Sequence, residues 1–206
     1  MQSTAAIARL GASRRGVPVR EARTEATIEE RPSVVWYFAY GSNMQSATLR
    51  GRRGIDYRRA VPVRAHGWRL VFDKPPLLPT GNSVANIVPD EAALVLGVAF
   101  EITDEDLAHV EHTEGVAFGN YKRVELAVEP LAEVEGAPAS AFSLSSELRD
   151  SEALPSIRYM SLLIEGAIEQ GLPGAHVEWL RAVQACEESA DMAALRPMLD
   201  TFFKRR

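Results

Sequence analysis

Two short segments carry the residue types that could do chemistry. The first is the turn Tyr40–Asn43, Tyr-Gly-Ser-Asn, which directly follows the apolar run Val34–Ala39. Glycine permits backbone conformations that other residues resist, and successive N–H groups at the start of a helix bind a carboxylate or a developing oxyanion. An ordinary strand-to-helix turn capped by asparagine has the same sequence. Local chemistry alone therefore leaves both interpretations open.

The second segment is Glu114–Tyr121, Glu-Gly-Val-Ala-Phe-Gly-Asn-Tyr. Glu114 follows a predicted helix and stands beside the apolar Val116 and Phe118. A carboxylate in a poorly solvated position takes up a proton readily near neutral pH, so Glu114 is a candidate general base. The alternative is an exposed glutamate at a helix end, which is the common place for such a residue.

Other chemistries find less support. His109 and His112 share one face of the predicted helix and could ligate a metal, but the sequence offers no obvious third ligand, so a solvated helix face is favoured. Ser42 lacks the surroundings of a nucleophile elbow. No phosphate-binding loop or dinucleotide fingerprint is present. We therefore expect neither a metal nor an organic cofactor.

The elements that must position these segments are mostly strands, with helices inserted and appended. The aromatic and β-branched run at 34–40 predicts a buried strand. Thr103–Asp106 resembles a capping box that opens a helix to about Thr113. Further strands are predicted at 58–73 (one or two strands), 84–88, 94–102, 122–128 and 139–145, and helices at 44–50, 157–171, 177–186 and 192–203. This order indicates an α+β domain.

Composition limits the partners. The chain has 206 residues, a net charge of -5 and one cysteine, Cys186, so it contains no internal disulfide and no cysteine-rich metal site. Its longest apolar run, 92–100, is far shorter than the roughly 20 residues of a membrane span. We expect a soluble, cytoplasmic protein that binds neither membrane nor nucleic acid, and the sequence leaves its oligomeric state open.

Charge is distributed unevenly along the chain. Residues 34–74 carry eight basic and two acidic residues. Such a stretch could attract an anionic substrate or an RNA strand. Because it alternates with apolar residues and lacks interleaved aromatic residues, a solvated strand face is the favoured interpretation. Residues 1–33 are poor in large apolar residues and are predicted to be a disordered extension, with the domain proper at 34–206.

Taken together, the two candidate segments resemble the γ-glutamylcyclotransferase family, also called AIG2-like. The resemblance rests on Tyr37–Met44, followed some 70 residues later by the Glu-Gly element at Glu114–Tyr121. It extends over about residues 34–186. Shorter matches lie in the expected order at Val84–Ile87, Gly97–Phe100, Pro155–Tyr159, Gly166–Ala167 and Gly171–Pro173.

The resemblance implies a fold, a site and a reaction. The fold would be a small closed mixed β-barrel with surrounding helices. Glu114 would be the catalytic acid and base. The substrate-binding residues would be those of the loop that holds the glutamyl group and two aromatic residues of the same pocket: Tyr37, Phe38, Ala39, Tyr40, Gly41, Ser42, Asn43, Tyr121 and Tyr159. Two departures are the proline-rich loop 74–83 and His176, which stands where a tyrosine is common.

The implied reaction is a cofactor-independent γ-glutamyl cyclotransfer. The α-amine of a γ-glutamyl amino acid or amine attacks its own γ-carbonyl and releases 5-oxoproline and the free amine. Glutathione and a γ-glutamyl biosynthetic intermediate are variants of this substrate that the sequence does not separate. The alternatives from other classes are a non-catalytic small-molecule-binding protein of the same fold and an RNA-contacting protein that uses the 50–74 stretch.

Overall fold

A computed structural model describes residues 33–78 and 81–204 of the chain. No helix within these residues is long and apolar enough to span a membrane. The predicted disorder of residues 1–33 concerns a segment of which only Ser33 is described.

Six strands form one mixed sheet in the order β4-β6-β1-β3-β2-β5. The strands are β1 (Val34–Ala39), β2 (Arg59–Lys74), β3 (Val84–Thr103), β4 (Lys122–Ala127), β5 (Glu129–Pro130) and β6 (Ser140–Ser145). β1 pairs with β3 antiparallel and with β6 parallel, so it lies inside the sheet. This placement explains why its sequence is aromatic and β-branched rather than alternating.

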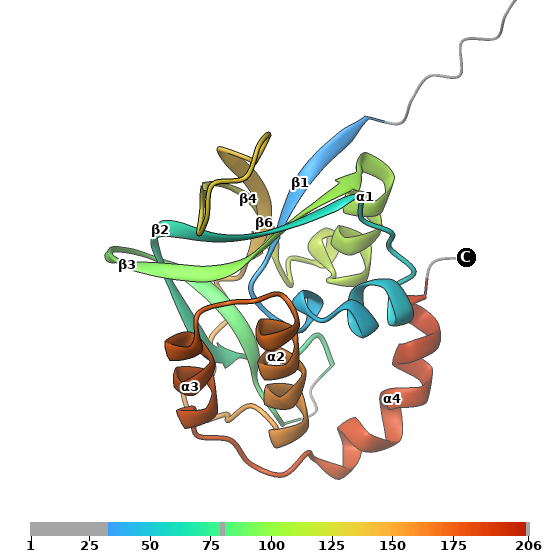
Figure 1. The fold of residues 1–206 in the computed structure, drawn as a ribbon. Helices are drawn as coiled ribbons and strands as arrows, with labels where there is room; N and C mark the ends of the chain where they lie inside the picture. The colour runs from blue at the N-terminus through green and yellow to red at the C-terminus, as the bar shows by residue number, and fades with distance from the viewer. Residues whose placement is uncertain (1–32, 79–80, 205–206) are drawn as a thin grey trace, which may run out of the picture. The chain divides into compact units, whose positions relative to one another are not determined.

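β2 and β3 are the longest strands of the sheet and form one antiparallel hairpin, which Figure 1 shows as two long ribbons side by side. The sequence predicted two strands in place of β3, at 84–88 and 94–102, separated by residues 89–93. The structure instead continues the strand through this exposed segment. The register shifts opposite it, between His66 and Trp68, where Gly67 has a φ of 80°. A shift of this kind bends the hairpin, so β3 can follow the bend as one continuous strand.

The sheet curls strongly, but the predicted closed barrel is not confirmed. Its edge strands β4 and β5 are separated in the chain only by Val128, so one short segment pairs with β6 at one end and with β2 at the other. No ladder joins β4 directly to β5 among the described residues. The two-residue β5 is too short to close the sheet by itself, and it was not predicted.

The helices surround this sheet. They are the short 3₁₀ and π turns η1 (Ser42–Met44), η2 (Ala47–Arg52) and η3 (Val116–Phe118), and the α-helices α1 (Asp104–Thr113), α2 (Ile157–Glu169), α3 (Gly174–Ala182) and α4 (Ala190–Phe203). The predicted capping box is present at Thr103 and Asp106. In Figure 1, α2 and α3 lie next to one another, whereas α4 stands apart from them.

A single hydrophobic core joins the sheet to α1 and α2. Phe38 of β1 and Phe100 of β3 are fully buried in it, together with Leu163 of α2. Burial of each such side chain contributes about 1.5–3 kcal/mol. The core therefore fixes β1, and with it the turn that β1 delivers at its carboxyl end.

Candidate active site

A cavity of about 200 Å³ brings the two predicted segments together. At one end, which we call the inner end, it is lined by Tyr37, Tyr40, Gly41, Ser42, Asn43, Arg53, Glu114, Tyr121 and Tyr159. Eight of the ten residues predicted for the site are among them. The other two, Phe38 and Ala39, are buried in the core instead and support the turn from behind.

The turn after β1 is held by two close approaches of glycine. A Cβ on Gly97 of β3 would lie 2.4 Å from the Ala39 carbonyl oxygen, so only glycine lets β3 pass this close to the end of β1. A Cβ on Gly166 of α2 would lie 2.7 Å from the backbone nitrogen of Gln45. The turn is therefore clamped between β3 and α2.

The backbone N–H groups of this turn are available to a ligand. η1 uses the amides of Met44 and Gln45, which donate to Gly41 and Ser42. The preceding amides of Ser42 and Asn43 have no assigned acceptor among the described residues. Unpaired N–H groups at the start of a helical turn are the feature that binds a carboxylate or an oxyanion.

Glu114 lies directly after α1, as its C-cap residue, with 23% of its side chain exposed. A negative charge is disfavoured at a helix C-terminus, where the helix dipole is itself negative. The structure offsets this with a cation, because the buried Arg53 guanidinium forms an ion pair with the Glu114 carboxylate.

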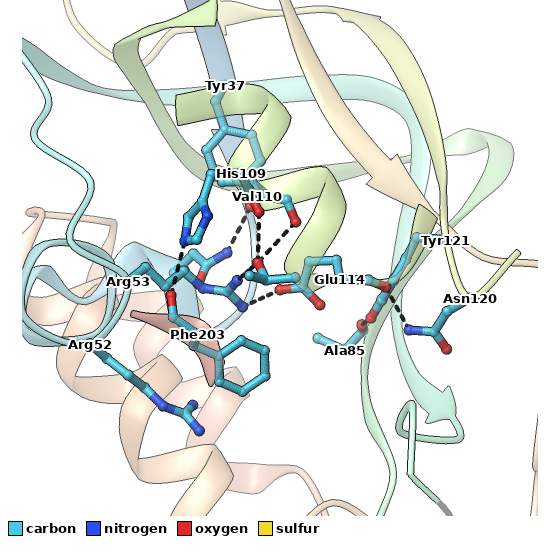
Figure 2. Close-up of polar contacts among 12 residues, drawn as sticks. Tyr37, Arg52, Arg53, Ala85, His109, Val110, Glu114, Asn120, Tyr121 and Phe203 are labelled. Atoms are coloured by element: carbon cyan, nitrogen blue, oxygen red, sulfur yellow. Dashed lines mark hydrogen bonds and ion pairs between the residues drawn. The ribbon is translucent and has the colours of Figure 1, made fainter. Parts of the chain in front are cut away.

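Arg53 joins both predicted segments through three separate nitrogens (Figure 2). Besides its ion pair with Glu114, it donates to Asn43 Oδ1 at 2.8 Å and to Thr113 Oγ1 at 2.6 Å. Asn43 in turn donates to Tyr37 Oη at 2.9 Å. One buried arginine thus sets the position of the carboxylate relative to the turn.

Three buried tyrosines, Tyr37, Tyr40 and Tyr121, and the partly buried Tyr159 line the same cavity as the carboxylate. Burial, reinforced by the Glu114 charge, raises the pKa of Tyr37 to about 12 and the pKa values of the other three phenols above their usual range. All four are therefore neutral at physiological pH. Two of them donate to backbone carbonyls, Tyr40 to Leu144 and Tyr121 to Ala85.

The remaining two phenols can still donate to a ligand. The hydroxyl of Tyr37 accepts from Asn43, and the hydroxyl of Tyr159 accepts from the Ala85 amide at 3.1 Å. Each keeps its own proton for another partner. A Cβ on Gly41 would lie 3.2 Å from Tyr159 Oη, so the glycine lets this hydroxyl approach the turn.

A second buried cation lies beside Glu114. Lys74, at the end of β2, is fully buried and donates to the Pro75 carbonyl oxygen at 2.6 Å and to Asn120 Oδ1 at 2.8 Å. Asn120 donates to the Glu114 backbone carbonyl at 2.8 Å. Burial lowers the pKa of Lys74 to about 8, although the nearby Glu114 charge opposes this shift.

The other end of the cavity, which we call the α4 end, is lined by one face of α4: Met192, Arg196, Leu199, Phe202 and Phe203. Arg196 there is ion-paired with Glu188. Figure 2 shows the Phe203 ring next to Arg53 and Glu114, so the two ends are continuous.

The surroundings of Glu114 differ from the prediction in two respects. Phe118 is 81% exposed and does not shield the carboxylate. The shielding comes instead from the tyrosines, which lie on other elements. The 34–74 stretch is not uniformly a solvated face either, because Arg53 and Lys74 are buried at the site.

Three further sequence expectations concern histidines. His109 donates through Nε2 to the Phe203 carbonyl oxygen at 2.9 Å, and the ring of His112 lies 6.0 Å from that of Phe202. Within the described residues, no cluster of three or more His, Cys, Asp or Glu could hold a metal ion. His176 stacks on Trp179 and does not line the cavity.

Three residues that line the cavity at or next to the inner end were not predicted for the site: Arg53, Lys74 and Asn120. Arg53 has no local mark that separates it from the neighbouring arginines at 50, 52 and 58. Asn120 lies inside the Glu114–Tyr121 segment but was not singled out. Lys74 had a usable signal, because it is one of only three lysines among 23 basic residues.

The geometry therefore defines an α+β protein with a carboxylate-bearing cavity, and several known proteins are similar to it in sequence and fold. The profile of the AIG2-like family matches residues 94–180. The γ-glutamyl cyclotransferase aclK of Aspergillus oryzae is 31% identical over 176 residues, which cover 76% of this chain and 64% of the relative. The γ-glutamylcyclotransferase of Homo sapiens is 29% identical over 159 residues, which cover 72% of this chain and 78% of the relative.

A solved γ-glutamyl cyclotransferase structure has the same fold. It superposes with a TM-score of 0.66 at 24% identity and covers 81% of this chain and 99% of its own. In sequence the chain is similar to the γ-glutamylcyclotransferase, or AIG2-like, family, and its fold is that of the solved member.

Proposed function

We propose that this chain is a γ-glutamyl cyclotransferase that converts a γ-glutamyl amino acid or amine into 5-oxoproline and the free amine. The observation that carries the proposal is the pairing of Glu114 with Arg53 opposite the Tyr40–Asn43 turn, inside one tyrosine-lined cavity. The names of the relatives described above support it.

The first step is removal of a proton from the substrate's α-ammonium group. Glu114 accepts this proton because it is a carboxylate inside the cavity, held at a fixed angle by Arg53. The only other carboxylate among the described lining residues, Glu188, is ion-paired with Arg196 at the α4 end. The four tyrosines are neutral, so none of them competes as a base.

The second step is closure of the five-membered ring. The free amine attacks the γ-carbonyl of the same molecule, and a substrate held in a reactive conformation has a large proximity advantage. In this proposal the amides of Ser42 and Asn43, which have no acceptor among the described residues, stabilise the oxyanion, and each well-aligned donor is worth about 3 kcal/mol. Glu114 then returns its proton to the departing nitrogen, the C–N bond breaks and the carbonyl re-forms. The attacking nitrogen gives up its second proton to the released amine, so the products are 5-oxoproline and the amine as an ammonium ion.

The roles of the remaining inner residues follow from their contacts. Tyr37 and Tyr159 each have a proton to donate to the glutamyl group. Tyr40 and Tyr121, which donate to backbone carbonyls, shape the walls of the cavity. Phe38 and Ala39 support the turn from the core. Every step uses the chain's own groups.

The test is release of 5-oxoproline from γ-glutamyl-alanine, γ-glutamyl-ε-lysine and glutathione by the full chain. We expect release from at least one compound, and the panel ranks the leaving groups. A binding protein of the same fold would bind a panel member, seen by calorimetry, without releasing 5-oxoproline. That outcome, or neither binding nor release, would contradict the proposal.

A further inference from the structure

One face of α4 lines the cavity without packing into a core. Met192, Arg196, Leu199 and Phe203 are spaced i, i+4, i+7 and i+11, which puts them on one side of the helix. We call this face the α4 stripe. All four residues are half-buried, and no described residue of α4 is fully buried. An amphipathic helix that leaves its apolar face against a cavity leaves that surface for a ligand to cover.

α4 is held in this position at both ends. At its start, Ser189 donates through its amide to Asn82 Oδ1 at 2.8 Å. At its end, Arg52 forms an ion pair with Asp200 at 2.6 Å, and His109 donates to the Phe203 carbonyl oxygen. The middle of the helix spans the cavity between these attachments.

The carboxyl-terminal residue of the stripe, Phe203, lies next to the ion pair of Arg53 and Glu114. The Arg53 guanidinium, which pairs with Glu114, lies 4.8 Å from the centre of the Phe203 ring (Figure 2). Phe203 therefore joins the stripe to the inner end, and a leaving amine that extends from a glutamyl group on this side of Arg53 would contact the stripe.

Besides Arg52, which is ion-paired with Asp200, and the exposed Arg158, the cavity has an apolar wall that completes this end. It is formed by Pro76, Leu77 and Leu78 of the loop after β2, and by Leu162 of α2. The one charge on the stripe, Arg196, is neutralised by its ion pair with Glu188. The surface facing the leaving group is thus dominated by apolar atoms, which favour an apolar ligand.

We infer that the α4 stripe and this wall form a leaving-group subsite that selects γ-glutamyl amides whose leaving amine carries a large apolar side chain. The inference rests on the proposed function, because it names the substrate class of the same site. An apolar pocket typically discriminates a side chain from a shorter one by about 10-fold or more in kcat/KM.

The test compares γ-glutamyl-phenylalanine and γ-glutamyl-leucine with γ-glutamyl-alanine as substrates of the full chain, measured as kcat/KM for 5-oxoproline release. We expect the two apolar compounds to be preferred by about 10-fold or more. The matched variants are Met192→Ala on the stripe and Met198→Ala, whose side chain is 56% exposed on the same helix and does not line the cavity.

Met192→Ala should reduce the phenylalanine-to-alanine preference by about 5-fold or more, and Met198→Ala should leave the preference unchanged. Leu199→Ala provides a second stripe variant if Met192→Ala unfolds. Release from γ-glutamyl-alanine with no preference for the apolar compounds would overturn this inference and leave the proposed function standing. A preference that both methionine variants reduce equally would also overturn it. No release from any of these three compounds would overturn this inference, and only a further absence of release from γ-glutamyl-ε-lysine and glutathione would overturn the proposed function as well.

Discussion

The inner end and the α4 end line the same cavity, but they are held in place by different forces. The inner end is formed by β1, its turn and the end of α1, and its side chains are linked by buried hydrogen bonds through Arg53. The α4 end is formed by a helix with no fully buried described residue, attached through side chains at its two ends. A rigid inner end fixes the positions of the reacting groups. The residues of the loosely packed α4 end can be substituted without moving those groups.

This difference predicts that the largest effects of substitution come from the polar links of the inner end. Arg53→Met removes the cation of a largely buried ion pair and leaves the Glu114 carboxylate without its partner. We expect the free energy of unfolding to fall by about 3 kcal/mol. We also expect kcat/KM to fall by about 100-fold, since a displacement of the base by about 1 Å is enough for such a loss.

The matched control is Arg52→Met, one residue earlier, whose ion pair with Asp200 is more exposed and belongs to the α4 end. Urea denaturation should show a change of about 1 kcal/mol or less for this variant. Equal losses of stability in the two variants would contradict the distinction between the two ends.

A smaller effect should follow from crowding the turn. Gly166→Ala places a Cβ 2.7 Å from the Gln45 amide nitrogen, so α2 must move away from the turn. Overpacking of this kind costs about 1–3 kcal/mol, which outweighs the helix propensity gained from alanine. Thermal unfolding would measure the loss of stability, and 5-oxoproline release would measure the effect of the displaced α2 on activity.

Gly174→Ala is the control for that substitution, because a Cβ there meets nothing within 4 Å. It should change the free energy of unfolding by no more than about 0.5 kcal/mol. If Gly166→Ala were equally silent, the close approach of α2 would not be what holds the turn.

The smallest effect concerns the dependence of stability on pH. Burial lowers the pKa of Lys74 from its usual 10.5 to about 8 in the folded protein. Between these values the unfolded chain binds more protons than the folded one, so the contribution of Lys74 to stability rises as pH increases from about 8 to 10.5. Below pH 8 the cost of burying the charged lysine is fully present.

Urea midpoints at pH 7.5 and 9.5 test this expectation against Lys74→Met, which cannot titrate at that position. The wild-type protein should gain stability relative to the variant at the higher pH. A constant difference between the two proteins across this range would show that Lys74 does not lose its proton there.

The residues of the inner end that sequence could predict are those with strong local signals. The aromatic run of β1, the glycine turn and the capping box of α1 each depend on neighbours within a few positions, and all were confirmed. Arg53 could not be recognised in this way. Its role comes from a side chain that reaches Thr113 and Glu114, about 60 positions along the chain, and no local pattern encodes such a contact.

In the fold, too, local features could be predicted from the sequence and long-range contacts could not. The continuous β3 was predicted as two strands, at 84–88 and 94–102, and Pro89 with the acidic residues after it disfavours a strand locally. The long pairing with β2 and a shift of register at Gly67 override that preference. The sequence shows that α4 has an apolar face. It does not show which surface lies opposite that face, because that surface is assembled from the loop after β2 and from α2.

The most direct test of the account is 5-oxoproline release from γ-glutamyl-alanine by Glu114→Gln, measured beside Glu111→Gln and the wild-type protein. The two glutamates lie three positions apart at the end of α1 and are similarly buried, but only Glu114 lines the cavity. The account predicts a loss of about 100- to 10,000-fold in kcat for Glu114→Gln, the range expected for removal of a general acid and base. Glu111→Gln should retain wild-type activity. Equal activity of the three folded proteins would contradict the role of Glu114 and the mechanism built on it.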